Sequence, residues 1–221
     1  MLLAVAVLAA GPARAAGESY SRAQTELFAT PHLENVTQPE TLHYDFRRSG
    51  AAARPLDDSI DVIVTEVRPD GRKNLSFRFL SGPNQRRFPP VEGFRGNPLI
   101  MLFLERDVAE MAAATGGSPL YFRTRLRAAF GTDAQVEDVT LPQATTSPPD
   151  ASGAKARLVT VEPFARDPMI DRFPRYKDKR YEFLLSAAVP GGVERLTTIL
   201  PAASGGQPAV EETVTFGKVE P

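Results

Sequence analysis

The chain has 221 residues, of which 42% are hydrophobic and 24% charged, and these fractions are typical of a folded protein. Its 26 basic and 27 acidic side chains leave a net charge of -1, so no excess positive charge favours nucleic-acid binding. The absence of cysteine excludes disulfides, thiolate catalysis and zinc–cysteine sites, and two histidines leave little material for metal or imidazole chemistry. The motifs of common hydrolases, metalloproteases and nucleotide-binding enzymes are also absent from the sequence. We therefore expect a protein without a cofactor or metal, and we name no catalytic residue.

An apolar segment begins the chain. Leu2–Ala10 is a run of Leu, Val and Ala, and Ala13-Arg14-Ala15 is a small-x-small site of the kind that signal peptidase cuts. The run has nine residues, whereas a membrane-spanning helix needs about 20, so we expect no permanent membrane anchor. We predict a signal peptide over residues 1–15, with a buried N-terminal helix as the alternative. The mature chain would then be periplasmic or secreted.

The mature residues 16–221 show no internal repeat and no change of composition, which predicts a single domain. Ser19–Ala29 is expected to form a short amphipathic helix that ends before Pro31, with Ala23, Leu27 and Phe28 on its apolar side. Thr41–Arg48 alternates between apolar and polar residues, as a half-buried strand does, and Leu42, Tyr44 and Phe46 share its apolar face.

A β-hairpin is predicted over Asp58–Leu80, with its turn at Pro69-Asp70-Gly71, because proline and glycine suit successive turn positions. One face of this hairpin is apolar, and its residues are Ile60, Val62, Val64, Leu75, Phe77 and Phe79.

Helical periodicity replaces the alternation after a Pro-rich link. Met101, Leu104, Val108 and Met111 recur at helical spacing and predict a helix from Pro98 to about Ala114. The polar face of this helix is expected to contain Glu105, Arg106, Asp107 and Glu110 in contact with water, with Arg106 and Glu110 paired. Gly116-Gly117 then forms a corner, and Ser118-Pro119 starts a second helix. The apolar stripe of that helix is Leu120, Phe122, Leu126, Ala129 and Phe130.

Alternation resumes in the second half of the chain. Five further strands are predicted over Gln135–Leu141, Arg157–Phe164, Lys179–Ser186, Glu194–Leu200 and Val210–Phe216. The fold class is therefore α+β: an antiparallel curved sheet, a half-barrel of about eight strands, covered by a central helix pair.

The candidate ligand-binding residues are the large apolar side chains of the first three strands and of the first long helix. In one interpretation they form the core between sheet and helices, and in the other some of them line an apolar hollow. They are Leu42, Tyr44, Phe46, Val62, Val64, Phe77, Phe79, Met101, Leu104 and Met111. The arginines at 86, 87, 123, 125 and 127 suit either an anionic headgroup or ordinary surface charge, and we favour the latter.

The order of elements over residues 18–216 resembles that of the LolA/LolB-like periplasmic lipoprotein carriers. This resemblance implies an incomplete barrel covered by helices that holds acyl chains in its hollow. No ligand-binding residue of that family is matched to a position here, and the lipidated cysteine of LolB has no counterpart. The stretch Asn97–Phe130, with Leu104-Glu105-Arg106-Asp107-Val108 and Gly116-Gly117-Ser118-Pro119, is also similar to exported bacterial proteins of unassigned function.

Three functions remain open. The first is a non-enzymatic periplasmic binding protein whose partner is a lipid or other hydrophobic small molecule. The second is an interaction or assembly factor for another exported protein, with Arg86, Arg87, Phe88 and Phe94 exposed on the Pro-rich link over 83–98. The third is an enzyme that uses only carboxylates and hydroxyls.

Overall fold

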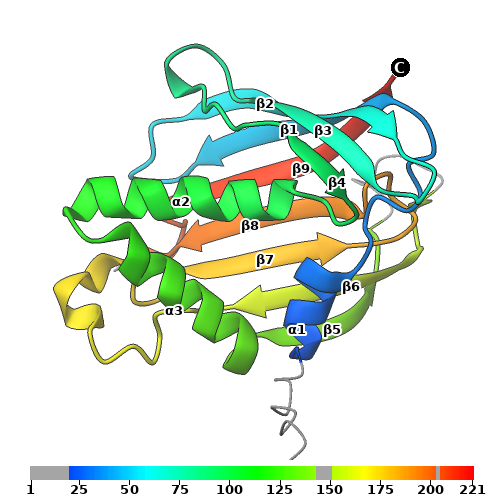
Figure 1. Cartoon of the computed structure of the whole chain (residues 1–221). Coiled ribbons are helices and arrows are strands. Elements are labelled where there is room, and N and C mark those ends of the chain that lie inside the picture. The colour runs from blue at the N-terminus through cyan, green and yellow to red at the C-terminus, as the bar shows by residue number, and fades with distance from the viewer. Residues whose placement is uncertain (1–19, 143–150, 203–204) are drawn as a thin grey trace, which may run out of the picture.

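The computed structural model of the chain describes residues 20–142, 151–202 and 205–221 (Figure 1). The predicted signal peptide over 1–15 lies outside the described residues. Within the described ranges, each helix is too short or too polar to cross a membrane.

A nine-stranded antiparallel sheet forms the body of the protein. The strands are β1 (Glu40–Ser49), β2 (Leu56–Val67), β3 (Lys73–Phe79), β4 (Val91–Phe94), β5 (Gln135–Thr140), β6 (Lys155–Val161), β7 (Arg180–Leu185), β8 (Val193–Leu200) and β9 (Val210–Glu220). Their spatial order is β4-β3-β2-β1-β9-β8-β7-β6-β5. Two meanders, one from each half of the chain, therefore meet where β1 pairs with β9, and the sheet stays open at β4 and β5.

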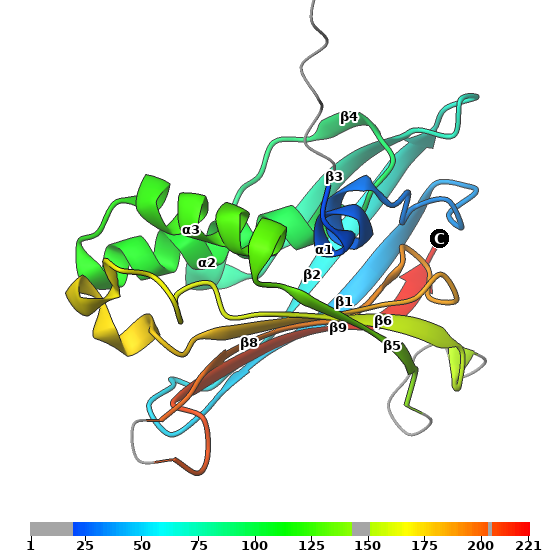
Figure 2. The same ribbon diagram turned by 90° about the horizontal axis from the view of Figure 1, so that it is seen from below.

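The helices cover the concave face of this sheet, as Figures 1 and 2 show. They are α1 (Arg22–Gln24), which continues into the π-helical η1 (Thr25–Ala29), α2 (Leu99–Thr115) and α3 (Pro119–Thr132). Short 3-10 turns are η2 (Gly82–Asn84), η4 (Ile170–Arg172) and η5 (Pro174–Tyr176). The chain leaves one edge strand, β4, forms α2 and α3, and then enters the other edge strand, β5. The helix pair must therefore cross the face of the sheet, and it covers the apolar side.

The predicted periodicities are confirmed in the first three strands. Leu42, Tyr44 and Phe46 are buried on one face of β1, and the hairpin of β2 and β3 has its turn where the sequence predicts it. The corner between the long helices is also confirmed, because Gly116 ends α2 with a φ of 65°, which favours glycine. The predicted fold class, a curved antiparallel sheet with a helical cover, is thus correct.

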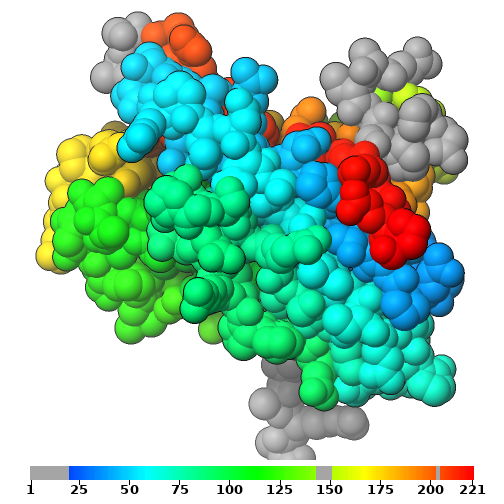
Figure 3. Space-filling view, turned by 90° about the horizontal axis from the view of Figure 1, so that it is seen from above, coloured from blue at the N-terminus to red at the C-terminus, as the bar shows by residue number. Residues whose placement is uncertain are grey.

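The ninth strand, β4, is absent from the sequence prediction. It lies in the Pro-rich link, where its four residues are too few to show alternation. The same link contains the aromatic residues expected to be exposed, and that expectation is wrong. Phe88 meets the ring of Phe79 edge-on at 5.2 Å, and Phe94 packs against the core. The link thus forms this edge of the sheet, and Figure 3 shows it at the surface next to the β2–β3 hairpin.

Candidate functional site

A groove of about 700 Å³ lies between α1, α2 and α3, on the helical side of the molecule. We call it the helical groove. The two long helices diverge from their corner, and α1 lies near the far end of α3 (Figure 1). Three segments line the groove: Tyr20, Gln24 and Phe28; Met101, Leu102, Leu104, Glu105 and Val108; and Leu120, Arg123, Thr124, Leu126, Arg127 and Phe130.

Large apolar side chains that contact water surround this groove. Tyr20, Phe28, Met101 and Leu120 expose 69, 42, 41 and 67% of their surface. Among the described residues only two other large hydrophobic side chains, Met169 and Val219, are exposed. Single exposed hydrophobic residues are common, whereas a group of them around one depression is typical of an interaction site.

The floor of the helical groove belongs to the core of the protein. Val108, Leu126 and Phe130 are buried, and Leu104 is nearly so. The ring of Phe28 meets that of Phe130 edge-on at 5.4 Å, which connects η1 to the C-terminal end of α3. A ligand in the groove would therefore rest on well-packed apolar side chains and replace water at the exposed ones.

One ion pair joins the two walls of the groove. The Nε and Nη2 atoms of Arg123 donate to the two carboxylate oxygens of Glu105 at 2.7 and 2.6 Å. These hydrogen bonds and the positive charge lower the pKa of Glu105, against the smaller effect of its burial. The pair connects α2 to α3 at this point.

A second depression, of about 300 Å³, lies at the C-terminal half of α2 and is lined by charged residues. We call it the charged pocket. Two hydrogen bonds of 2.8 and 3.0 Å join Arg106 to Glu212, and Arg48 donates to the same carboxylate at 2.5 Å. Burial alone would raise the pKa of Glu212, but the hydrogen bonds and charges of Arg106 and Arg48 lower it to about 2.

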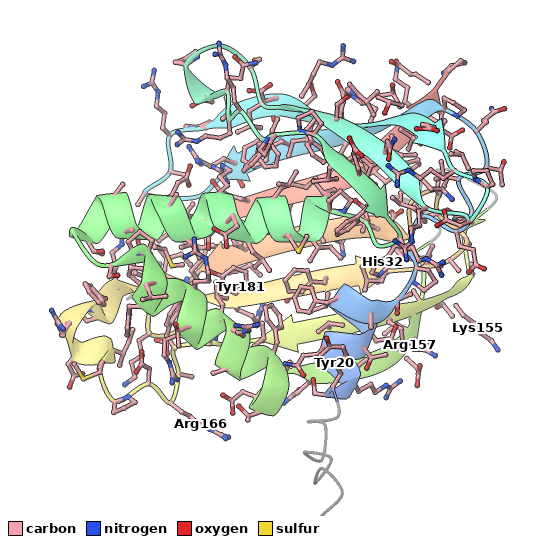
Figure 4. All side chains as sticks on the ribbon, in the orientation of Figure 1. Tyr20, His32, Lys155, Arg157, Arg166 and Tyr181 are labelled. Carbon is pink, nitrogen blue, oxygen red and sulfur yellow. The ribbon has the colours of Figure 1, made fainter. Side chains whose placement is uncertain are left out.

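The charged pocket corrects the prediction for the polar face of α2. Arg106 and Asp107 are 3% and 2% exposed, so they do not contact water as the sequence suggests. Asp107 accepts from Lys179 at 2.5 Å and from the hydroxyl of Tyr181, which Figure 4 shows behind the helices. The predicted pair of Arg106 with Glu110 is present at 2.8 Å.

Three carboxylates of this pocket lie close enough to bind a metal ion. Oxygen atoms of Asp107, Glu110 and Glu212 are within 4.8 Å of one another. Each carboxylate is already paired with a cationic side chain: Lys179 for Asp107, and Arg106 for the other two. Because these cations supply the opposite charge, the arrangement is that of a buried ion network.

A third depression, of about 440 Å³, lies between the N-terminal segment and the ends of β6 and β7. His32, Lys155 and Arg157 lie around it (Figure 4). Burial lowers the pKa of His32, more than its hydrogen bond to the backbone of Glu26 raises it. The Nε2 atom is 2.8 Å from the carbonyl oxygen of Glu26, and Nδ1 is 3.4 Å from the amide of Asn97. Both ring nitrogens therefore hold the backbone in place.

The structure separates the sequence-predicted ligand residues into three groups. Met101 and Leu104 line the helical groove, although Met101 is exposed at its rim and does not point into the interior. Met111 lines the charged pocket. The strand residues pack in the core and line none of the three depressions; these are Leu42, Tyr44, Phe46, Val62, Val64, Phe77 and Phe79.

Sequence reasoning missed most of the helical groove. Phe28 and Leu120 were expected on buried helix faces, and both are exposed there. Periodicity identifies which residues share a face, but the divergence of α2 and α3 leaves parts of those faces uncovered.

The open sheet, its helical cover and the apolar groove define an α+β half-barrel protein with a surface suited to hydrophobic molecules. No model of a protein family matches the chain, and no curated protein matches its sequence. Among solved structures the chain is similar to the lipoprotein LppX of Mycobacterium tuberculosis. The identity is 12% over 90% of this chain and 94% of that chain, with a TM-score of 0.36.

A second similar structure is a LolA superfamily protein from Nitrosomonas europaea, with 9% identity over 90% of this chain and 92% of that chain. Its TM-score is 0.27.

Proposed function

We propose that this protein is a non-enzymatic binding protein that holds a lipid or other hydrophobic molecule in the helical groove. The observation that carries the proposal is the gathering of Tyr20, Phe28, Met101 and Leu120 around one depression. The groove volume of about 700 Å³ lies in the range of roughly 300–1,000 Å³ that is typical of small-molecule sites. Burial of apolar surface there contributes about 25 cal/mol for each Å² removed from water.

The place of action is also part of this proposal. The apolar run over Leu2–Ala10 and the cleavage site at Ala13-Arg14-Ala15 support export, so that residues 16–221 would act as one domain in the periplasm or outside the cell. The strand residues beneath α2 would contact a ligand only if the helices moved away from the sheet, because they are buried now. The helical groove is therefore the site at which a ligand first binds.

Binding of an uncharged fluorescent dye, N-phenyl-1-naphthylamine, tests the proposal, because its emission rises in apolar surroundings. We expect saturable binding by the purified full chain, and Leu120→Glu should weaken it by roughly ten- to 100-fold, since burial of a Leu contributes about 1.5–3 kcal/mol. Met169→Glu is the matched control, because Met169 is 47% exposed and lies outside the groove. Equal loss in both variants, or no binding by the unmodified chain, would exclude the groove as the site.

A further inference from the structure

We infer that the ligand of the helical groove is a single-chain amphiphile with an anionic head, such as a fatty acid, and that Arg127 binds the head. This inference rests on the proposed function and specifies its ligand class. It depends on the charges that line the groove, where one cation has no ion-pair partner among the described residues.

The charged side chains that line the groove are Glu105, Arg123 and Arg127. Glu105 and Arg123 neutralise each other through two hydrogen bonds of 2.7 and 2.6 Å. Arg127, by contrast, has no carboxylate within ion-pair distance in the part of the chain that the structure describes. An apolar groove with one uncompensated guanidinium is complementary to an apolar chain with one negative charge.

A second donor lies near Arg127. The side-chain oxygen of Gln24 accepts from the amide of Ser21 at 2.9 Å, which leaves its NH2 group as the free end. That nitrogen lies 3.5 Å from the position that a Cβ would have on Gly131, one helical turn after Arg127. The guanidinium and the amide therefore lie at the same end of the groove. Both are hydrogen-bond donors, and a carboxylate offers two acceptor oxygens.

The position of Arg127 also orients the ligand. Leu120 lies seven residues earlier on the same face of α3, which corresponds to about 10 Å along the helix. A head bound at Arg127 would thus direct its chain along Thr124 and over the buried Leu126 toward Leu120. The groove volume of about 700 Å³ suits one such chain and is small for a lipid with several chains.

A competition experiment with two ligands of equal chain length tests this inference. Dodecanoic acid and dodecanol are each titrated into the full chain with bound N-phenyl-1-naphthylamine at pH 8, where the acid is ionised, and the loss of dye emission is measured. We expect the acid to bind about tenfold more tightly than the alcohol at low salt, and the difference to shrink as salt screens the charge.

Variants separate the role of Arg127 from that of the groove. Arg127→Gln should weaken the binding of dodecanoic acid about tenfold and leave the binding of dodecanol unchanged. Glu105→Gln removes the carboxylate that pairs with Arg123, so it should strengthen the binding of dodecanoic acid and leave that of dodecanol unchanged. Arg166→Gln is the control, since this side chain is 86% exposed and lies outside the groove (Figure 4).

The outcomes distinguish the two proposals. The inference about the head is wrong, and the binding function stands, if the dye and dodecanol bind but dodecanoic acid binds no more tightly than dodecanol. The same holds if Arg127→Gln lowers the affinity for the acid and for the alcohol equally. If neither the dye nor either ligand binds the folded protein, the proposed function itself is wrong.

Discussion

A buried carboxyl group in β8 offers a sharp test of the structure. Glu194 is 2% exposed, and its Oε2 atom has no hydrogen-bond partner among the described residues. It lies at a bulge, because Leu184 pairs with Arg195 whereas Leu185 pairs with Val193. Burial, only partly offset by the charge of Arg195, raises the pKa of Glu194 to about 7.

The raised pKa makes the folded state less stable as pH rises. The unfolded chain releases the proton near pH 4.5 and the folded chain near 7, so the stabilising effect of the protonated form is complete below about 4.5. It is lost as pH rises through 7. At about 1.4 kcal/mol for each pH unit, the loss amounts to about 3 kcal/mol.

Glu194→Gln removes the titration while keeping the shape of the side chain. We expect the variant to equal the unmodified protein at pH 4 and to exceed its free energy of unfolding by up to about 3 kcal/mol at pH 8. Urea unfolding followed by circular dichroism measures this, since the chain has no tryptophan for fluorescence.

Glu182→Gln is the control, because it removes a half-buried carboxylate of the neighbouring strand that is paired with Arg180 at 3.0 Å. We expect a change of less than about 1 kcal/mol for this control at either pH. If the free energy of unfolding changed with pH in the same way for Glu194→Gln and for the unmodified protein, a raised pKa of Glu194 would be refuted.

Two further predictions concern the packing of the core. Gly191→Ala should destabilise by about 2–4 kcal/mol, because residue 191 has a φ of 76° and a Cβ there would lie 2.5 Å from Leu42 Cδ1. Gly71→Ala is the control: residue 71 has a φ of 78° with open space around it, so this substitution should cost only about 1 kcal/mol. Equal melting temperatures of the Gly191 and Gly71 variants would contradict the close contact with Leu42. Arg106→Met should lower the free energy of unfolding by about 3 kcal/mol, because the buried Glu212 loses two hydrogen bonds and keeps only the one from Arg48. Replacing both residues by Met should recover most of that loss in urea titrations, and a double variant as unstable as the single one would argue against the pair.

The sheet could largely be predicted from the sequence. Alternation places Leu42, Tyr44 and Phe46 on one face without knowledge of their partners, because the period of a strand is two residues. The strand β4 could not be predicted in this way, since its pairing with β3 depends on a surface that the sequence pattern does not reveal.

The charged face of α2 could not be predicted because its partners are distant in sequence. Arg106 contacts Glu212, which follows it by 106 residues, and Asp107 contacts Lys179, 72 residues later. Polarity alone places such residues in water. The helical groove was also beyond prediction, because it depends on the angle between α2 and α3 and on the position of α1.

The pairing of β1 with β9 has a consequence for how the protein forms. The strand β9 is the last of the nine described strands and yet lies near the middle of the sheet, so the two meanders stay unconnected until β9 has been synthesised. A nascent chain therefore exposes the unpaired edge of β1 throughout its synthesis. Completion of the sheet therefore waits for β9, so the native fold forms late in synthesis and not progressively from the first strands.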